Sequence, residues 1–308
     1  MKPKVIISRC LTNCNCRWDG EVIHFPAIRQ INNYFDLITV CPEVDIGLGV
    51  PRKPIGLFSR EGHIEVEELD SHVVMTEKVK AYSDHFLEQF PRVHGFISKS
   101  KSPSCGIKNV KILTLNQYIL STTGTGLFAR KLLNSLPCIA TIDETGLLVP
   151  EIREQFFTKL FAFFNLSKAN TNISDLIKFH SQNKYLFMAY NPQKQKEAGG
   201  IIGTNQHNDF NQLFCNYSLK VAEILKDAPS VSSNINVLQH LFGYFSKKHL
   251  TTHDKQSFLN SLTMYNANKI PISEIKAIIR KWAFKYSQNF LKEQSYLQPF
   301  PAELLSCV

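Results

Sequence analysis

The first half of this sequence alternates short β-rich runs with helical stretches, and this alternation is what most constrains the fold. Residues 73–90 have the apolar spacing of an amphipathic helix and separate two of the β-rich runs. Strands that alternate with helices favour an α/β layer structure with a mostly parallel sheet. Four runs are predicted to be strands: residues 4–8, 37–40, 95–98 and 138–142.

The second half changes to helical periodicity. Its last segment carries the clearest apolar stripe, from Ile275 to Phe290, and Pro271 precedes its start. Residues 191–208 are expected to form a loop that exposes lysines. Five helices are predicted, at residues 175–190, 211–226, 234–249, 255–266 and 273–297.

This change of pattern predicts two domains of different class. We expect an α/β domain at residues 1–165 and an all-α domain at residues 174–308. The polar run at residues 167–172 is the expected connection between them.

Basic residues are concentrated in the second half. Residues 1–150 hold 17 Lys and Arg against 15 Asp and Glu, a net charge of +2. Residues 151–308 hold 18 against 11, a net charge of +7. The asymmetry favours an anionic partner such as RNA, with a basic solvated surface as the alternative. Candidate RNA-contacting side chains are those of Lys184, Lys194 and Lys196.

The same region offers a polar group on one helix face. His180, Asn183 and Lys184 are spaced i, i+3 and i+4, so they share a side of the predicted helix. An RNA-contacting stripe and a buried packing motif are equally compatible with this spacing.

The interpretation of the eight cysteines depends on whether the protein is in a reducing compartment. No run of the sequence approaches the twenty apolar residues of a membrane span, and we expect a soluble cytoplasmic protein. Cytosolic thiols stay reduced, which favours metal binding, catalysis or simple burial over disulfides.

Three of these cysteines follow predicted strands. Cys10 comes just after the first strand, Cys41 directly after the second, and Cys105 in the loop after the third. The carboxyl ends of parallel strands share one edge of a sheet, where ligand sites form. We therefore expect these three thiols to converge.

Several short motifs surround the three cysteines. They are Ser8-Arg9-Cys10-Leu11, Arg17-Trp18-Asp19-Gly20, Cys41-Pro42-Glu43, Pro51-Arg52-Lys53-Pro54 and Lys101-Ser102-Pro103-Ser104-Cys105-Gly106. In this order and spacing, over roughly half of the chain, they resemble the thiouracil desulfidase family of bacterial iron–sulfur enzymes. Each motif alone is a weak signal, and their combination is specific.

The helical half resembles a domain commonly fused to that family. The resemblance is carried by His180-x-x-Asn183-Lys184 and Gln294-x-Tyr296-x-x-Pro299-x-Pro301, among others. The fusions are associated with removal of sulfur from thiouridine in tRNA, and the added domain with RNA binding. The resemblance thus implies thiolated tRNA as substrate, with no membrane and no stable protein partner.

The resemblance also implies a cofactor and a set of site residues. Cys10, Cys41 and Cys105 are implied to hold a [4Fe–4S] cluster, in which three protein ligands leave one iron open to bind sulfur. Glu43 is implied as the catalytic acid/base, and Ser102 as a hydrogen-bond donor to the substrate or the leaving sulfur. Water replaces sulfur at the ring carbon, sulfide is released, and no net redox change is needed.

Three alternatives stay open at the level of function. Free thiouracil is one possible substrate, with the helical half used for assembly. A non-catalytic RNA-binding or metal-sensing protein with zinc or a structural cluster is the second. Cluster Lewis-acid chemistry on another substrate, such as a dehydration, is the third.

Some nearby residues have two interpretations. Cys14 and Cys16 fit no common zinc spacing and are expected not to bind metal, although Cys16 stands where the family commonly has an aliphatic residue. Arg17, Asp19 and Arg52 are candidates either for shaping the pocket or for fixing its loops. The segment Gly124-Thr125-Gly126 precedes a predicted helix and is more typical of a turn than of a phosphate cradle.

Overall fold

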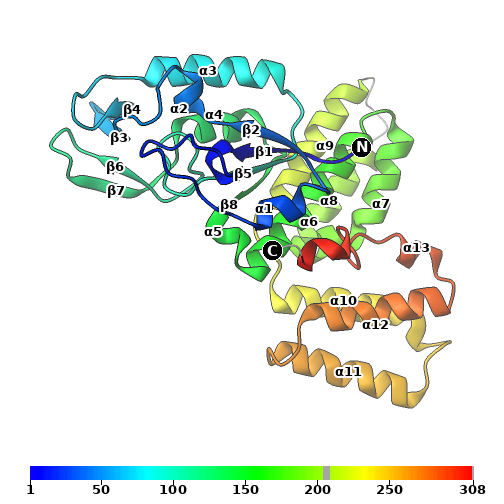
Figure 1. The fold of residues 1–308 in the computed structure, drawn as a ribbon. Helices are drawn as coiled ribbons and strands as arrows, with labels where there is room; N and C mark the ends of the chain where they lie inside the picture. The colour runs from blue at the N-terminus through cyan, green and yellow to red at the C-terminus, as the bar shows by residue number, and fades with distance from the viewer. Residues whose placement is uncertain (204–208, 307–308) are drawn as a thin grey trace. The chain divides into compact units, whose positions relative to one another are not determined.

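The structure is a computed structural model that describes residues 1–203 and 209–306 (Figure 1). The chain divides into two compact units. The first consists of Met1–Phe163 together with the residues from Ala302 onward, and the second of Phe164–Pro301. The division falls within helix α6 (Pro150–Lys168), and the next helix begins at Ile173.

The first unit contains a four-stranded parallel sheet in the order β2-β1-β5-β8 (Figure 1). The predicted α/β class and parallel sheet are confirmed. All four predicted strands are present, and the last begins two residues later than expected because Cys138 and Ile139 precede the pairing with β5. The strands are β1 (Lys4–Ser8), β2 (Asp36–Val40), β5 (Gly95–Ser98) and β8 (Ala140–Asp143).

Helices cover both faces of this sheet. Neighbouring residues of a strand point to opposite faces. Phe96 packs edge-on against Phe128 of α4 (Leu127–Ser135), which also contacts Phe86 of α3 (Thr76–Gln89). On the other face, a Cβ at Gly95 would lie 2.8 Å from the end of the Leu160 side chain of α6, so this helix packs closely on the strand. The burial of β1 and β5 on both faces is typical of central parallel strands.

A second sheet of the first unit was not predicted. Its order is β4-β3-β6-β7, with one parallel pair between β3 and β6. Charged residues obscured it: Glu67 in β4 is fully buried, and Arg60 of β3 neutralises it through bonds of 2.5 and 3.0 Å. The strands are β3 (Ile55–Arg60), β4 (His63–Glu68), β6 (Val110–Leu113) and β7 (Ile119–Gly124).

Short helices complete the first unit. They are η1 (Arg9–Leu11), α1 (Ala27–Ile31), α2 (Pro42–Asp45), α5 (Glu144–Leu147) and η2 (Ala302–Ser306).

The second unit is helical, as predicted. Its main helices have buried apolar stripes that pack on one another. They are α7 (Ile173–Tyr190), α8 (Pro192–Gly203), α9 (Phe210–Ile224), α10 (Val231–Ser246), α11 (Thr252–Asn266), α12 (Ile272–Lys285) and α13 (Asn289–Lys292).

The loop predicted at residues 191–208 is wrong for residues 192–203, which form α8. Pro192 occupies the first helical position, which suits proline because its missing N–H would have no helical partner there. The Asn191 side chain accepts a hydrogen bond from the Lys194 N–H at 2.9 Å and so caps the helix. Residues 204–208 lie outside the described part of the chain.

The single long helix predicted at residues 273–297 is also wrong, because α12 ends at Lys285. Ser287 adopts a left-handed conformation with φ of 52°. The Gln288 N–H then bonds to the Ala283 carbonyl at 2.9 Å and the Ser287 N–H to Phe284 at 3.3 Å. This is the Schellman arrangement that ends helices. Each helix within residues 1–203 and 209–306 is either too short or too polar to span a bilayer.

Candidate functional site

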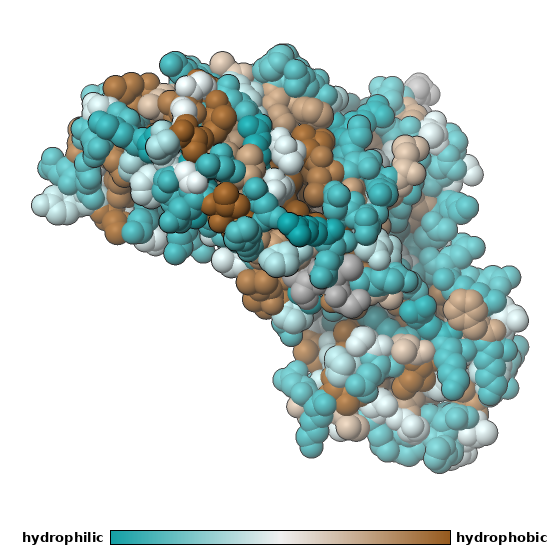
Figure 2. Space-filling model, in the orientation of Figure 1, coloured by the Kyte–Doolittle hydropathy of each residue, from teal (hydrophilic) through white to brown (hydrophobic). Residues whose placement is uncertain are grey.

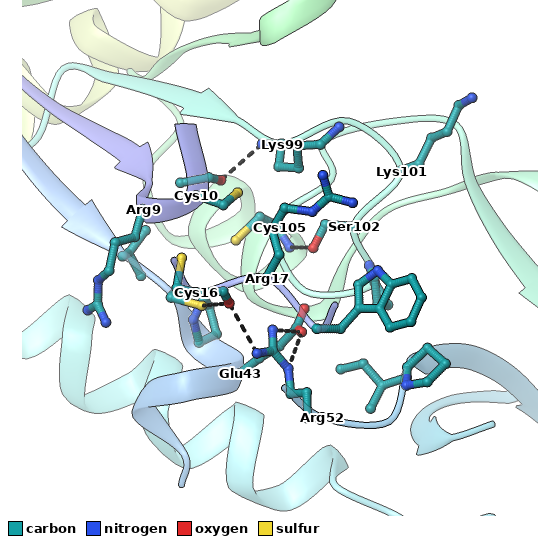
Figure 3. A pocket seen from close by; sticks show the side chains of 18 of the residues that line it. Arg9, Cys10, Cys16, Arg17, Glu43, Arg52, Lys99, Lys101, Ser102 and Cys105 are labelled. Atoms are coloured by element: carbon teal, nitrogen blue, oxygen red, sulfur yellow. Dashed lines mark hydrogen bonds and ion pairs between the residues drawn. The ribbon is translucent and has the colours of Figure 1, made fainter. Parts of the chain in front are cut away.

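A cavity of about 270 Å³ opens at the carboxyl edge of the parallel sheet (Figure 3). Residues that directly follow β1, β2 and β5 line it, so segments far apart in sequence meet there. The predicted convergence is confirmed, since all five residues proposed for the cluster and its chemistry are among the lining side chains: Cys10, Cys41, Glu43, Ser102 and Cys105.

Local structure places each of the three predicted thiols. Cys10 lies in η1, directly after β1, and is half-buried. Cys41 is the residue before α2, whose first position is Pro42. Cys105 follows β5 in a tight loop and is 5% exposed.

Cys16 is a fourth thiol in this cavity, which sequence reasoning did not assign to the site. It is buried, and its carbonyl accepts a hydrogen bond from the Cys41 thiol at 3.8 Å. Cys14, two residues earlier, is half-buried and is not part of the lining. Cys138 and Cys215 also lie elsewhere, and Cys307 is outside the described residues.

The surroundings disfavour free thiolates. Burial raises the pKa of the Cys105 thiol far above its ordinary value. The hydrogen bond with Cys16, followed by burial, does the same to the pKa of Cys41. Contact with the Cys10 thiol is the main cause that raises the pKa of Cys16 to about 12. A cation bound among these thiols would compensate the negative charge and allow them to ionise.

The donor set fits an iron–sulfur cluster. Thiolates are the usual ligands of such clusters, and several of them face one cavity here. Within residues 1–203 and 209–306, no three Cys, His, Asp or Glu side chains are arranged to enclose a single metal ion. The ligands of a four-iron cluster bind separate irons, so they need not point at one centre.

Glu43 is held by two partners at the cavity wall. Arg52 donates to its Oε2 from Nη2 at 2.5 Å and from Nε at 3.1 Å, and both side chains are largely buried. The Ser104 hydroxyl donates to Oε1 at 3.1 Å. Arg52 also donates to the Cys16 carbonyl at 3.0 Å. Arg52 therefore both lines the pocket and fixes its loops, and Ser104 was missed although it lies within a recognised motif.

Ser102 uses its hydroxyl oxygen to fix the loop that carries Cys105. The oxygen accepts hydrogen bonds from the Cys105 N–H at 3.0 Å and from the Ser104 N–H at 3.3 Å. A hydroxyl has one proton to donate beyond these accepted bonds. The side chain lines the cavity, where that proton can reach a bound ligand.

The same loop caps helix α4. The N–H groups of Gly126 and Leu127 donate to the carbonyls of Gly106 and Pro103 at 2.8 and 2.9 Å, and Ala129 donates to Ser104 at 3.1 Å. These N–H groups at the start of the helix therefore already bond to carbonyls of the protein. The turn interpretation of residues 124–126 fits the structure better than a phosphate cradle.

Basic side chains and one aromatic ring surround the cavity. Trp18 lines it and is 47% exposed, so its ring is open to a ligand. Arg9 pairs with Asp45 at 2.9 Å and Lys99 with Glu144 at 2.5 Å. The lining includes one carboxylate, that of Glu43, and five cations: Arg9, Arg17, Arg52, Lys99 and Lys101.

Arg17 and Lys101 differ in how they are held. Arg17 pairs with Asp19 at 2.6 Å, within one loop. Lys101 has a left-handed backbone with φ of 60° and is exposed, and Figure 3 shows its side chain extending away from the thiols. Its position at the rim was not anticipated from the sequence.

The candidate RNA-contacting lysines all belong to the second unit. Lys184 and Lys196 are exposed, whereas Lys194 is half-buried and lies 3.9 Å from Glu223. The space-filling view shows many hydrophilic side chains over this part of the surface (Figure 2).

The neighbours of Lys184 on α7 serve packing. His180 bonds to the buried Tyr217 hydroxyl at 3.0 Å, and burial lowers the pKa of His180. Asn183 is buried and accepts a bond from the Ser295 hydroxyl at 2.7 Å. The packing interpretation therefore holds for two members of the predicted polar stripe, and only Lys184 is exposed.

Comparisons with known proteins divide the chain in the same way. Residues 5–144 match the family described as 2-thiouracil desulfurase, and residues 184–301 match the family described as protein of unknown function DUF1722. The uncharacterized protein YbgA of Escherichia coli K12 is 22% identical over 127 residues, which are 41% of this chain and 75% of that protein. A solved structure of the [4Fe-4S]-dependent thiouracil desulfidase TudS is 24% identical, with a TM-score of 0.38, and covers 50% of this chain and 97% of its own. The N-terminal part of the chain thus matches the 2-thiouracil desulfurase family model, and the C-terminal part matches the DUF1722 model.

Proposed function

We propose that this protein removes sulfur from thiouridine in tRNA, converting it to uridine with release of sulfide. The observation that carries the proposal is the meeting of Cys10, Cys41, Cys105 and Glu43 around one cavity, in the part of the chain that matches the 2-thiouracil desulfurase family model. In this proposal the three cysteines hold a [4Fe–4S] cluster. When bound, the cluster supplies an iron that accepts the thiocarbonyl sulfur as a Lewis acid.

The side chains of the cavity have separate tasks in the reaction. The carboxylate of Glu43 accepts a proton from the water that attacks the ring carbon. Ser102 donates its hydroxyl proton in a hydrogen bond to the departing sulfur. The carbon–sulfur bond breaks, a carbon–oxygen bond replaces it, and sulfide leaves with the protons of the water. Carbon keeps its oxidation state, so no electron acceptor is required.

The cavity also has features that suit a polynucleotide. The exposed Trp18 ring offers a stacking surface for a pyrimidine base. The surrounding cations, with Lys101 at the rim, suit the phosphates on either side of a target nucleotide. The net charge of +7 in residues 151–308 adds a second region attractive to RNA.

The decisive measurement is sulfide release from thiouridine-containing tRNA and from free thiouracil, each at 50 and 200 mM salt. RNA contacts release counterions, so RNA turnover at limiting substrate should fall by roughly tenfold or more if several phosphates are bound. Turnover of the free base should change little. Equal rates on both substrates, unaffected by salt, would rule out recognition of the RNA.

Metal analysis of anaerobically purified protein tests the cofactor. Iron and acid-labile sulfide in equal amounts are expected. Tightly bound zinc without iron would support a structural metal site instead and end the desulfidase proposal.

A further inference from the structure

Cys16 faces the cavity together with the three cysteines of the proposed cluster site. Its side chain is 3% exposed. It lines this cavity together with Cys10, Cys41 and Cys105, and Figure 3 shows the labelled thiols of Cys10, Cys16 and Cys105 gathered on one side of the pocket. The cavity therefore offers four thiols, where the proposed reaction uses three.

A buried network fixes this residue at the cavity wall. The Cys16 carbonyl accepts a hydrogen bond from Arg52 Nη1 at 3.0 Å. Arg52 is held in turn by Glu43. Cys14 is close in sequence and lies outside the lining. Cys16 is thus held at the site by Arg52, which also holds the proposed catalytic carboxylate.

We propose that Cys16 binds the iron left open by Cys10, Cys41 and Cys105 when no substrate is present. The inference rests on the proposed function, because it concerns the iron that would bind the substrate sulfur. On binding, the Cys16 thiol loses its proton to solvent and forms one iron–sulfur bond. The thiocarbonyl sulfur of the substrate displaces it, and the released thiolate takes up a proton. No electron is transferred in either direction.

This arrangement has two measurable consequences. A cluster with four thiolate ligands retains its fourth iron, whereas a cluster with three holds that iron only through its sulfides and solvent. A ligand attached to the same chain also competes with substrate at an effective concentration in the millimolar range. Removing Cys16 should therefore make the fourth iron labile and lower the KM for substrate.

The experiment compares wild-type protein with Cys16→Val and the matched control Cys14→Val, all loaded anaerobically with iron and sulfide. Each is treated with ferricyanide, and iron per chain is measured together with the electron paramagnetic resonance signal of a three-iron cluster. Wild type and Cys14→Val should lose the fourth iron slowly, and Cys16→Val should lose it ~10²-fold faster. This factor is the low end of the gain in affinity from a tethered ligand. Equal rates of iron loss in all three proteins would overturn the inference.

A second measurement needs no variant, in case Cys16→Val does not load. Mössbauer spectroscopy of substrate-free wild type should show only thiolate-bound irons. One distinct iron that lacks a thiolate would overturn the inference, whatever the variant does.

Sulfide release separates this inference from the proposed function. If no protein releases sulfide from thiouridine but iron loss depends on Cys16, the desulfidase proposal fails and the role of Cys16 stands. If wild type and Cys16→Val both release sulfide and lose iron alike, the proposed function stands and Cys16 has no such role.

Discussion

Glu43 is positioned for proton transfer by Arg52 and Ser104, which leave the carboxylate at the cavity wall. Replacing Glu43 by Gln keeps the size and most hydrogen-bonding capacity of the side chain but removes the proton acceptor. Sulfide release should fall ~10²–10⁴-fold, the usual contribution of an acid/base group. Iron content should stay at the wild-type level. Full activity with an intact cluster would remove Glu43 from the mechanism.

Arg52 and Glu43 form an ion pair in which the side chains are 8% and 13% exposed. Arg52→Met should leave the carboxylate buried without its partner and lower the free energy of unfolding by about 3–5 kcal/mol. Denaturant melts of the protein measure this change.

The control for this prediction is Arg17→Met. Arg17 pairs with Asp19 within one loop, and its side chain is 28% exposed. The loss there should be smaller, about 1 kcal/mol or less. The double variant Glu43→Gln/Arg52→Met should recover part of the stability, because no unpaired charge remains. If the losses in free energy of unfolding of the two single variants simply add up in the double variant, the pair does not act as a unit.

At the level of elements, the start of α4 supports the loop that carries Ser102 and Cys105. A Cβ at Gly126 would lie 2.5 Å from the Ser104 carbonyl oxygen. Backbone cannot move aside as a flexible side chain can, so Gly126→Ala must displace the loop or the helix. We expect a loss of about 1–3 kcal/mol in the free energy of unfolding, and incomplete iron loading.

Gly49→Ala is the matched control, because a Cβ there meets no atom within 4 Å. It should load iron like the wild type. Normal loading and stability in Gly126→Ala would show that the loop tolerates the displacement and that its position is not set by α4.

At the scale of the whole molecule, the prediction concerns RNA binding by the second unit. The triple variant Lys184→Ala/Lys194→Ala/Lys196→Ala removes three positive charges from the second unit. If all three contact phosphates, the slope of log K against log salt should become shallower by ~2 to 3. Binding of tRNA measured over a salt series gives this slope, and sulfide release from free thiouracil should be unchanged.

The control removes the same charge from exposed lysines of the first unit: Lys2, Lys78 and Lys108. Its slope should stay near that of the wild type. Equal slopes for both triple variants would indicate a general effect of net charge and would exclude these three lysines as specific RNA contacts.

The sequence by itself determined the parallel sheet, the helical second half and the meeting of three thiols. These features follow from local patterns, since apolar periodicity distinguishes strand from helix and parallel strands end at one edge. Cys10 and Cys41 directly follow the neighbouring strands β1 and β2, and the loop after β5 brings Cys105 to the same edge.

Only the tertiary structure decided which side chains complete the site. Glu43 is held by Arg52 and by Ser104, and Ser104 is 61 positions away in the sequence. No periodicity in the sequence predicts such a pairing. In the same way, the burial of Glu67 depends on an ion pair with Arg60 of the neighbouring strand. The break of the last long helix at Ser287 is set by backbone geometry that its apolar stripe does not record. The same holds for Cys16, because only the folded loop after β1 brings it to the cavity wall, where its carbonyl accepts a bond from the Cys41 thiol at 3.8 Å.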